Sequence, residues 1–589
     1  MDAANTFNRV EGVKTALRQR SARWAHPDFI VRLLLIGLLL ILIALPLAQL
    51  AFTTVRTQGF DVWTEVLTGR IAPNLLWTPL LNSLMVGGLV SLGTLLVGSF
   101  MAWLVMMTDV PGRRTLGLLA SIPFILPSFA IALAWETLFR NDLVGGRTGF
   151  LFELGFQIPN WLSWGPVPIV LTLVAHYYTT PFLLISAALA TINTELVEAG
   201  EMTGASRFHV LRGITLPLVF PAILSAGMLT FAEGVSNFTS PALLGLPVRF
   251  QTLSTRIYGL VNNGQLERAY VLTIILIVIA AFLLLVNSYI IRRRGTFATI
   301  TGKAGRRRRT QLGKWRPAAF AAGFLIVFTT AIVPLIVLIA SSMTVRTNSL
   351  TSGFSLHYWI GESTANIAQG QAGVLNNPLI LQAAATTITF AIATAITGTI
   401  FGILIGYATR GIPTRSKSAI AILSFIPFFI PGVAFGAMYV AQFGRSFGPI
   451  PALYGTFTLL VLAGFAKTLP FSSQSGRAVF SQIAGEIDEA AVLAGARFPR
   501  RLFAIFVPLT IRGLIAGAVL VFVKMVRDLS LVVLLVTPTT FTLSMLAFRY
   551  ASEGFGQFAN AITVIIALIA ISVTWLANRL QGASQPWSE

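Results

Sequence analysis

The chain of 589 residues contains no cysteine and only four histidines. Disulfide bonds and cysteine-based metal sites are therefore excluded, and a histidine-rich transition-metal site is not expected. Charged residues are also scarce, at 11% of the chain, whereas soluble globular proteins carry roughly 25%. Acidic side chains are the scarcer sign, with 21 against 42 lysines and arginines. This composition does not fit a soluble globular protein.

Apolar runs of about twenty residues, the length that a helix needs to cross the bilayer core, recur along the whole chain. The runs do not alternate between polar and apolar residues, which argues against a transmembrane β-barrel. The first run is longer than the apolar part of a signal peptide, so we expect it to be retained. We predict an all-α polytopic membrane protein with about twelve transmembrane helices, at residues 29–53, 79–107, 115–139, 166–190, 214–244, 269–291, 317–342, 381–409, 418–442, 453–475, 511–536 and 557–578.

Lysine and arginine are distributed unequally between alternate loops. With the N-terminus placed in the cytoplasm, the inner segments hold 28 of them and the outer loops hold ten. The densest cluster, at 292–316, has ten basic residues and no acidic one. Cytoplasmic loops carry such an excess and face anionic lipid, so this cluster does not indicate nucleic-acid binding. We therefore predict that both termini lie in the cytoplasm.

The sequence repeats itself. The segment "IPFILPSFAIALAW" at 122–135 matches "IPFFIPGVAFGAMY" at 426–439, with an offset of 304 residues. The segment "EAGEMTGA" at 198–205 matches "EAAVLAGA" at 489–496, with an offset of 291. The repeat divides the twelve predicted helices into two halves of six. Because six is even, both halves insert into the membrane in the same orientation and are related by an axis along the membrane normal. The predicted parts are an N-terminal cytoplasmic segment (1–28), a first domain (29–291), a basic linker (292–316), a second domain (317–580) and a C-terminal tail (581–589).

The repeated polar loop carries a recognisable pattern. Its first copy follows E-A-A-x3-G-x9-I-x-L-P at Glu198, Ala199, Gly204, Ile214, Leu216 and Pro217, and its second copy at Glu489, Ala490, Ala491, Gly495, Ile505 and Pro508. Gly200 replaces the second alanine of the first copy, and Val507 replaces the leucine of the second. The pattern resembles the signature loop of permease subunits of binding-protein-dependent ABC importers. The resemblance covers nearly the whole chain and suggests a type I importer fold, similar to the fused permeases of the ferric-iron class.

In the family this resemblance points to, each loop forms a short coupling helix that docks in a groove of a separate ATPase subunit. Small residues at such a loop allow close approach of a partner, and the glycine ends the helix. The coupling residues implied in this chain are Glu195, Glu198, Ala199, Gly200, Gly204, Ala205, Pro217, Glu486, Glu489, Ala490, Ala491, Gly495, Ala496 and Pro508.

The chain itself is not expected to be an enzyme, because no G-x4-G-K-[ST] phosphate-binding loop is present. The implied partners are two ATPase subunits, which bind ATP and magnesium, and a periplasmic or tethered substrate-binding protein. No cofactor or metal is expected on this chain. The implied location is the bacterial cytoplasmic (inner) membrane.

Ionisable residues inside apolar runs are costly and often functional. Glu233 lies sixteen residues beyond Pro217, or ~24 Å along a helix, so it is expected past the middle of the membrane. We expect Asn237 one turn further on the same helix face. The candidates for the translocation path are Glu233, Asn237, Lys524, Arg527 and Asp528. A structural clamp between the halves explains the same residues and is compatible with a path; His176, Tyr177, Tyr178 and Lys467 are weaker candidates, with His176 favoured as a core residue.

Two pairs of prolines lie one turn apart in equivalent runs, at Pro123, Pro127, Pro427 and Pro431. Proline removes a helical hydrogen bond, and the freed carbonyl is tolerated at membrane depth only when it is buried or faces a cavity. We interpret the prolines as kinks at the interface of the halves and candidate gate elements.

The cargo is less determined than the class of transporter. The carboxylates of the candidate path suit ferric iron. The two basic side chains of the same path, Lys524 and Arg527, suit an anion equally well. Ferric iron is the leading prediction, with thiamine, aminoethylphosphonate, sugar phosphate and polyamine import as alternatives. A remote alternative is a major-facilitator secondary transporter, because "TDVPGRR" at 108–114 resembles the D-R-x-G-R-R loop of that superfamily.

Overall fold

The computed structural model describes residues 27–56, 59–192, 202–204, 206–294, 310–364, 368–411, 414–446 and 451–581. Helices make up the regular structure of these residues, together with two isolated β-bridges, and no strand is formed among them. The predicted all-α fold is confirmed. The larger parts of the predicted N-terminal segment, linker and tail lie outside the described residues.

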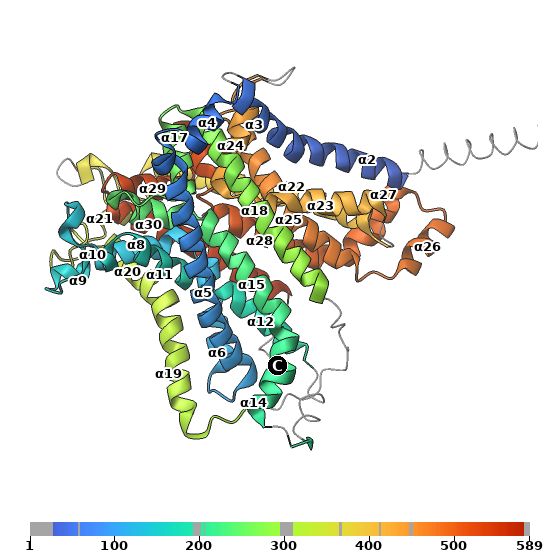
Figure 1. The fold of residues 1–589 in the computed structure, drawn as a ribbon, viewed down its shortest axis with the longest axis horizontal. Coiled ribbons are helices and arrows are strands. Elements are labelled where there is room, and N and C mark those ends of the chain that lie inside the picture. The colour runs from blue at the N-terminus through green and yellow to red at the C-terminus, as the bar shows by residue number, and fades with distance from the viewer. Residues whose placement is uncertain are drawn as a thin grey trace, which may run out of the picture. The chain divides into compact units, whose positions relative to one another are not determined.

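The helices of the first half run from blue to green in Figure 1. They are α2 (Pro27–Leu39), η1 (Leu40–Ala44), α3 (Leu45–Arg56), α4 (Asp61–Thr68), η2 (Pro73–Trp77), α5 (Thr78–Met107), α6 (Arg113–Ala120), α7 (Ile122–Ile125), α8 (Ser128–Phe139), η3 (Asp142–Val144), α9 (Phe150–Glu153), α10 (Asn160–Ser163), α11 (Pro166–Tyr177), α12 (Thr179–Ala190), α14 (Arg207–Val210), η4 (Leu211–Thr215), α15 (Leu216–Ser236), α16 (Thr239–Leu244), η5 (Leu246–Val248), α17 (Leu253–Asn262) and α18 (Leu266–Arg294).

The helices of the second half continue from yellow to red (Figure 1). They are η6 (Gly313–Trp315), α19 (Arg316–Val327), η7 (Phe328–Ile332), α20 (Val333–Ser342), α21 (His357–Ile360), η8 (Ala368–Gly370), α22 (Pro378–Thr409), α23 (Arg415–Phe429), α24 (Gly432–Phe443), α25 (Phe457–Phe480), α26 (Gly485–Leu493), α27 (Phe498–Arg500), η9 (Arg501–Phe506), α28 (Val507–Arg527), η10 (Val532–Leu534), η11 (Pro538–Thr540), α29 (Leu543–Ser552) and α30 (Gly556–Gln581).

Among the described residues, eight helical segments are long and apolar enough to cross a membrane, or up to ten if each of two bent helix pairs is one span. The eight are Phe29–Arg56, Pro73–Met107, Asn160–Ala190, Leu211–Ser236, Gly313–Ser342, Pro378–Thr409, Phe498–Arg527 and Gly556–Ala577. The predicted runs at 269–291 and 453–475 form α18 and α25 but are not among these ten, so the predicted number of twelve is not confirmed.

The chain divides into two compact units that alternate along the sequence. The first unit comprises residues 1–49, 392–428 and 464–522, and the second comprises 50–391, 429–463 and 523–589. Each unit therefore takes residues from both predicted halves.

In the second unit, α12 and α15 pack against α5 through small residues. A Cβ atom on Gly98 would lie 2.7 Å from the carbonyl oxygen of Tyr178, and one on Gly234 would lie 3.0 Å from the Cα of Gly87. Lipid offers no hydrophobic driving force for helix association, so such close backbone approach is how membrane helices gain packing energy.

The two halves exchange contacts within this unit. In one direction, α8 of the first half packs against α20 and α30 of the second. In the other direction, α24, which is equivalent to α8 at the offset of 304, packs against α17 and α18 of the first half. Buried Asn560 of α30 joins the first group, because its side-chain amide donates to Ser341 at 2.8 Å and to Thr137 at 3.3 Å.

Repeated hydrogen bonds accompany the repeated sequence. The N–H of Leu253, at the start of α17, donates to the Ser83 hydroxyl at 2.8 Å. The N–H of Leu543, at the start of α29, donates to the Thr387 hydroxyl at the same distance. Ser83 and Thr387 are 304 residues apart, and the two leucines are 290 apart. This conserved local geometry supports the predicted duplication.

A loop of each half also meets the other outside the membrane-spanning segments. Glu153 at the end of α9 accepts hydrogen bonds from the hydroxyls of Ser349 and Thr351 and, at 2.6 Å, from the N–H of Leu350. Burial alone would raise the pKa of Glu153, but the hydrogen bonds from these three residues hold the pKa below its usual value of 4.5. The ionised carboxylate therefore joins the two loops at neutral pH.

The first unit is built on an equally close helix contact. A Cβ atom on Gly476 of α25 would overlap the carbonyl oxygen of Gly402 on α22, and one on Gly406 would lie 2.7 Å from the carbonyl oxygen of Gly476. Beyond this contact, four buried residues form an apolar cluster: Tyr407, Phe480, Leu502 and Phe506.

We expect Gly476→Ala to destabilise the protein, because the added methyl group forces α22 and α25 apart, at a cost of ~1–3 kcal/mol. The measurement is the thermal unfolding midpoint of the detergent-purified protein. Gly213→Ala is the matched control, since a Cβ atom there meets nothing within 4 Å. An equal midpoint for both variants would contradict the close contact.

Candidate functional site

A cluster of charged side chains of the second unit lies at the ends of two equivalent helices. Glu233 is in the last turn of α15, and Lys524 and Arg527 are in the last turn of α28. Glu233 and Lys524 are 291 residues apart, so they occupy equivalent positions in the two halves. Both cations lie close enough to Glu233 for direct electrostatic interaction. The Oε2 atom of Glu233 is buried without a hydrogen-bond partner, so this carboxylate has an unused acceptor.

Asn237 and Asp528, the other predicted path residues, lie just outside these helices. The expected helical spans 214–244 and 511–536 and the expected position of Asn237 on the face of Glu233 are therefore wrong: α15 ends at Ser236 and α28 at Arg527. Asn237 is extended, with ψ at 130°.

The side chains of these two residues explain why the helices end there. The Oδ1 atom of Asn237 accepts the N–H of Ser240 at 3.1 Å, and the Oδ1 atom of Asp528 accepts the N–H of Leu531 at 2.9 Å. Each side chain thus caps the turn that follows, a local alternative to continuing the helix.

Arg527 also holds the broken helix of the other half. The helical segments Arg113–Ile125 and Ser128–Phe139 meet at an angle of 92° around Pro127. At this break Arg527 donates from Nη1 to the carbonyl oxygen of Leu126 at 3.1 Å, and its guanidinium lies 5.0 Å from the centre of the Phe124 ring. A carbonyl freed at membrane depth requires such a donor.

The predicted proline kinks have different local roles. Pro127 and Pro431 are the residues directly before α8 and α24, where the helices are interrupted. Pro123 lies in the first turn of α7, and Pro427 lies inside α23. In the first unit, Lys467 donates from Nζ to the carbonyl oxygen of Pro427 at 2.9 Å.

Two of the weaker candidates lie close to the cluster. Tyr177 accepts at its hydroxyl a hydrogen bond of 3.1 Å from the side-chain amide of Asn237. His176 is only 6% exposed and stacks edge-on against Tyr177, as expected for a core residue.

The second polar loop contains the predicted short helix. α26 includes Glu486, Glu489, Ala490 and Ala491, and Gly495 follows its end with φ at +74°. The N–H groups of Gly495 and Ala496 donate to the carbonyls of Val492 and Ala491, both at 2.9 Å. Glycine adopts this left-handed conformation without steric cost, which is why the helix stops there. Pro508 is the second residue of α28, where its missing N–H costs little.

The first polar loop is described only in part. Glu195, Glu198, Ala199, Gly200 and Ala205 lie outside the described residues. Gly204 has φ at +82°, matching Gly495, and Pro217 is the second residue of α15.

In the described part of each loop, one apolar side chain that the sequence pattern does not single out is more than four-fifths exposed. Met202 is 83% exposed and Leu493 is 88% exposed. These two residues are 291 apart and thus equivalent.

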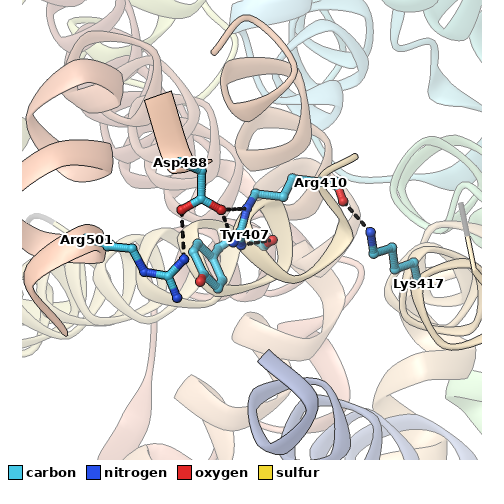
Figure 2. A network of polar contacts seen from close by, with 5 residues as sticks. All are labelled: Tyr407, Arg410, Lys417, Asp488 and Arg501. Carbon is cyan, nitrogen blue, oxygen red and sulfur yellow. Dashed lines mark hydrogen bonds and ion pairs between the residues drawn. The ribbon is translucent and has the colours of Figure 1, made fainter. Parts of the chain in front are cut away.

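A charge network around the second loop was also missed from sequence. Asp488 of α26 accepts from Arg410 and Arg501, and Lys417 donates to the carbonyl of Arg410 (Figure 2). The network lies beside a cavity of about 990 Å³ in the first unit. Arg410 and Arg501 entered the sequence interpretation only as cytoplasmic charges, because their shared partner is distant along the chain.

Known proteins with similar sequences identify the class of this molecule. The family model of the binding-protein-dependent transport system inner membrane component matches residues 94–296. The molybdenum transport system permease protein ModB of Escherichia coli K12 is 30% identical over 223 residues, which are 37% of this chain and 93% of that protein. The chain belongs to this permease family.

Two further relatives extend the similarity. The ferric transport system permease protein FbpB of Actinobacillus pleuropneumoniae is 24% identical over 512 residues, covering 84% of this permease and 71% of that protein. A second relative is the protein named "Putative 2-aminoethylphosphonate transport system permease protein PhnV" of Salmonella typhimurium LT2. It is 27% identical over 265 residues, which are 44% of this permease and 92% of that protein. The match to FbpB runs through both halves, so the permease is of the fused class.

The family fixes the general role. The permease is the inner membrane component of a binding-protein-dependent ABC importer, and it is not itself an enzyme. This sets aside the major-facilitator alternative. Among the described residues of the permease, no group of three or more His, Asp or Glu side chains is placed to hold a metal ion.

We expect Arg527→Met to lower the stability of the permease, because the carbonyl of Leu126 loses its donor inside the membrane, at a cost of ~1–3 kcal/mol. The measurement is the thermal unfolding midpoint in detergent. Arg549→Met is the control, since Arg549 is 44% exposed and pairs with Glu553 on the surface of α29. The role of Arg527 at the break is refuted if the two variants unfold at the same temperature.

Proposed function

We propose that this permease carries ferric iron across the inner membrane in an ATP-driven importer, with both permease domains on one chain. The proposed cargo rests on the similarity to FbpB over 84% of the chain, because this similarity spans both halves rather than one domain. The two domains are 29–291 and 317–580, joined by the basic linker 292–316, with both termini in the cytoplasm.

The proposed engagement of the motor uses one loop of each domain. Residues 195–212 and 486–503 each dock on one of two ATPase subunits, which hold ATP and magnesium. The exposed side chains of Met202 and Leu493 support this, because an apolar side chain on a small helix can anchor in a groove of a partner. Gly204 and Gly495 leave the backbone behind each anchor open, as a Cβ atom there meets nothing within 4 Å.

The proposed path lies between the ends of α15 and α28. Glu233, Asn237, Lys524, Arg527 and Asp528 line it, and a periplasmic or tethered binding protein delivers the cargo. Arg527 belongs to one half and holds the bent helix of the other, which supports a gate at Pro127 that responds to movement of α28. Pro431 takes the equivalent place in the second half.

A specific observation supports a second class of cargo. Lys524 and Arg527 give the path two cations beside its carboxylates, and the relatives ModB and PhnV are named for molybdenum and for 2-aminoethylphosphonate transport. Import of a small anion is therefore the alternative to ferric iron.

The test is uptake by proteoliposomes that contain the permease with the ATPase and binding protein that purify with it. We expect accumulation of radioactive ferric ion that requires ATP inside and binding protein outside. Accumulation of 2-aminoethylphosphonate or molybdate instead would select the anion alternative, and uptake driven by an ion gradient without ATP would refute the proposed mechanism.

We expect Gly495→Trp to reduce ATP-dependent uptake by about tenfold while membrane insertion stays normal, because coupling energies of this kind are worth 1–3 kcal/mol. The left-handed backbone and the space needed by the partner are both lost in this variant. Gly204→Trp should behave in the same way. Gly554→Trp is the control, since Gly554 also has a positive φ, at +86°, but follows α29 and is part of neither loop. Normal uptake in the Gly204 and Gly495 variants and in their double variant would exclude docking through these loops.

A further inference from the structure

A carboxylate of the second loop binds two guanidinium groups of the surrounding helices. The Oδ2 atom of Asp488 accepts from Arg410 at 2.6 Å from Nη2 and at 3.2 Å from Nε, and its Oδ1 atom accepts from Nη1 of Arg501 at 2.8 Å. Figure 2 shows Asp488 between the two guanidinium groups. Both oxygens are thus bound to cations, and the side chains of Asp488 and Arg410 are each 20% exposed.

The other residues of this network belong to three different segments of the first unit. Arg410 directly follows α22, and Arg501 begins η9, the turn that leads into α28. Lys417 of α23 donates to the carbonyl of Arg410, so it joins the same network. Asp488 therefore links the docking helix α26 to the ends of three predicted membrane spans.

The platform below the network is rigid. The guanidinium of Arg410 lies 3.5 Å from the centre of the Tyr407 ring and 5.5 Å from that of Phe506. Tyr407 is fully buried, Phe506 is 2% exposed, and both belong to the apolar cluster of this unit. A cation held between a carboxylate and aromatic rings keeps one orientation, because both contacts depend on direction.

The equivalent positions in the first half cannot form this network. At the offset of 291, Val197 stands in place of Asp488 and Val210 in place of Arg501. At the offset of 304, Met106 stands in place of Arg410. Val210 and Met106 are buried, at 5% and 2% exposure, as apolar packing requires. The charged contact of the second loop therefore has no counterpart at these equivalent positions of the first half.

We propose that Asp488 is a positioning residue that locks the second docking loop to the membrane helices, through a contact that the residues at the equivalent positions of the first half cannot make. This inference rests on the proposed docking of the second loop. A carboxylate held by two guanidinium groups resists displacement in several directions. Movement of the second ATPase subunit is then passed through η9, which begins at Arg501, to α28, which ends at Arg527.

The first test separates coupling from assembly. In proteoliposomes with the ATPase and binding protein, we expect Asp488→Asn to lower ferric uptake per ATP hydrolysed by about tenfold, with the ATPase still bound and active. Glu553→Gln is the matched control: it also breaks an ion pair with an arginine, at a surface position outside both loops. Its uptake per ATP should equal that of the unchanged protein.

The second test addresses the case in which Asp488→Asn only destabilises the protein, because it leaves two guanidinium groups without their acceptor. The triple variant Arg410→Met, Asp488→Val, Arg501→Val installs the residues of the first half. Replacing a buried charge network by apolar residues is often neutral for stability. We expect this variant to unfold near the temperature of the unchanged protein but to keep the low uptake per ATP.

Two outcomes overturn the inference. One is normal coupling in the triple variant, which would show that packing alone suffices in the second loop. The other is normal coupling in Asp488→Asn. Both require that the unchanged permease shows ATP-dependent uptake; if it shows none, the proposed function fails and not this inference alone.

Discussion

A backbone carbonyl that is freed inside a bilayer must find a donor, and this requirement organises the centre of the permease. The bend at Pro127 frees the carbonyl of Leu126, and the donor is Arg527 from the other half of the chain. A proline bend that left this carbonyl without a donor would only destabilise the protein. Here the hydrogen bond at the bend fixes the end of α28 against α7 and α8. In the first unit, Lys467 meets the same requirement at the carbonyl of Pro427. In both places an expensive intramembrane cation is retained because it satisfies an equally expensive carbonyl.

The position of Arg527 connects this requirement to the proposed motor. Segment Phe498–Arg527 is one helical stretch, with Arg501 near its start and Arg527 at its end. Arg501 is bound to Asp488 of the docking loop, and Arg527 is bound to the bent helix. Polar contacts fix both distance and direction, so the contact at each end of this stretch holds its own arginine in a defined orientation. The two arginines thus give the coupling proposal a physical route.

The sequence predicted the helical membrane fold and the short helix with its glycine end in the second loop, because each depends on residues close together in the chain. It did not predict that α15 and α28 end at Ser236 and Arg527. Apolar residues continue past both points, and hydropathy does not register an Asn or Asp side chain that caps a turn three residues ahead. The Asp488 network was missed for another reason: its members are 13 and 78 residues apart, and only folding brings Arg410 and Arg501 to one carboxylate.

Fusion of two similar halves gives this permease a freedom that a pair of identical subunits lacks. Tyr258 and Phe548 are equivalent residues, 290 apart, and their rings touch with centroids 6.3 Å apart, so they lie close to the axis that relates the halves. Glu233 and Lys524 are equivalent as well and interact with each other. In two identical subunits, a glutamate near the axis would face its own copy, and two like charges at membrane depth repel strongly. A single chain can place glutamate on one side and lysine on the other. The same freedom allows valine at position 197 and aspartate at position 488, so the duplication preserves the apolar framework while the polar residues diverge.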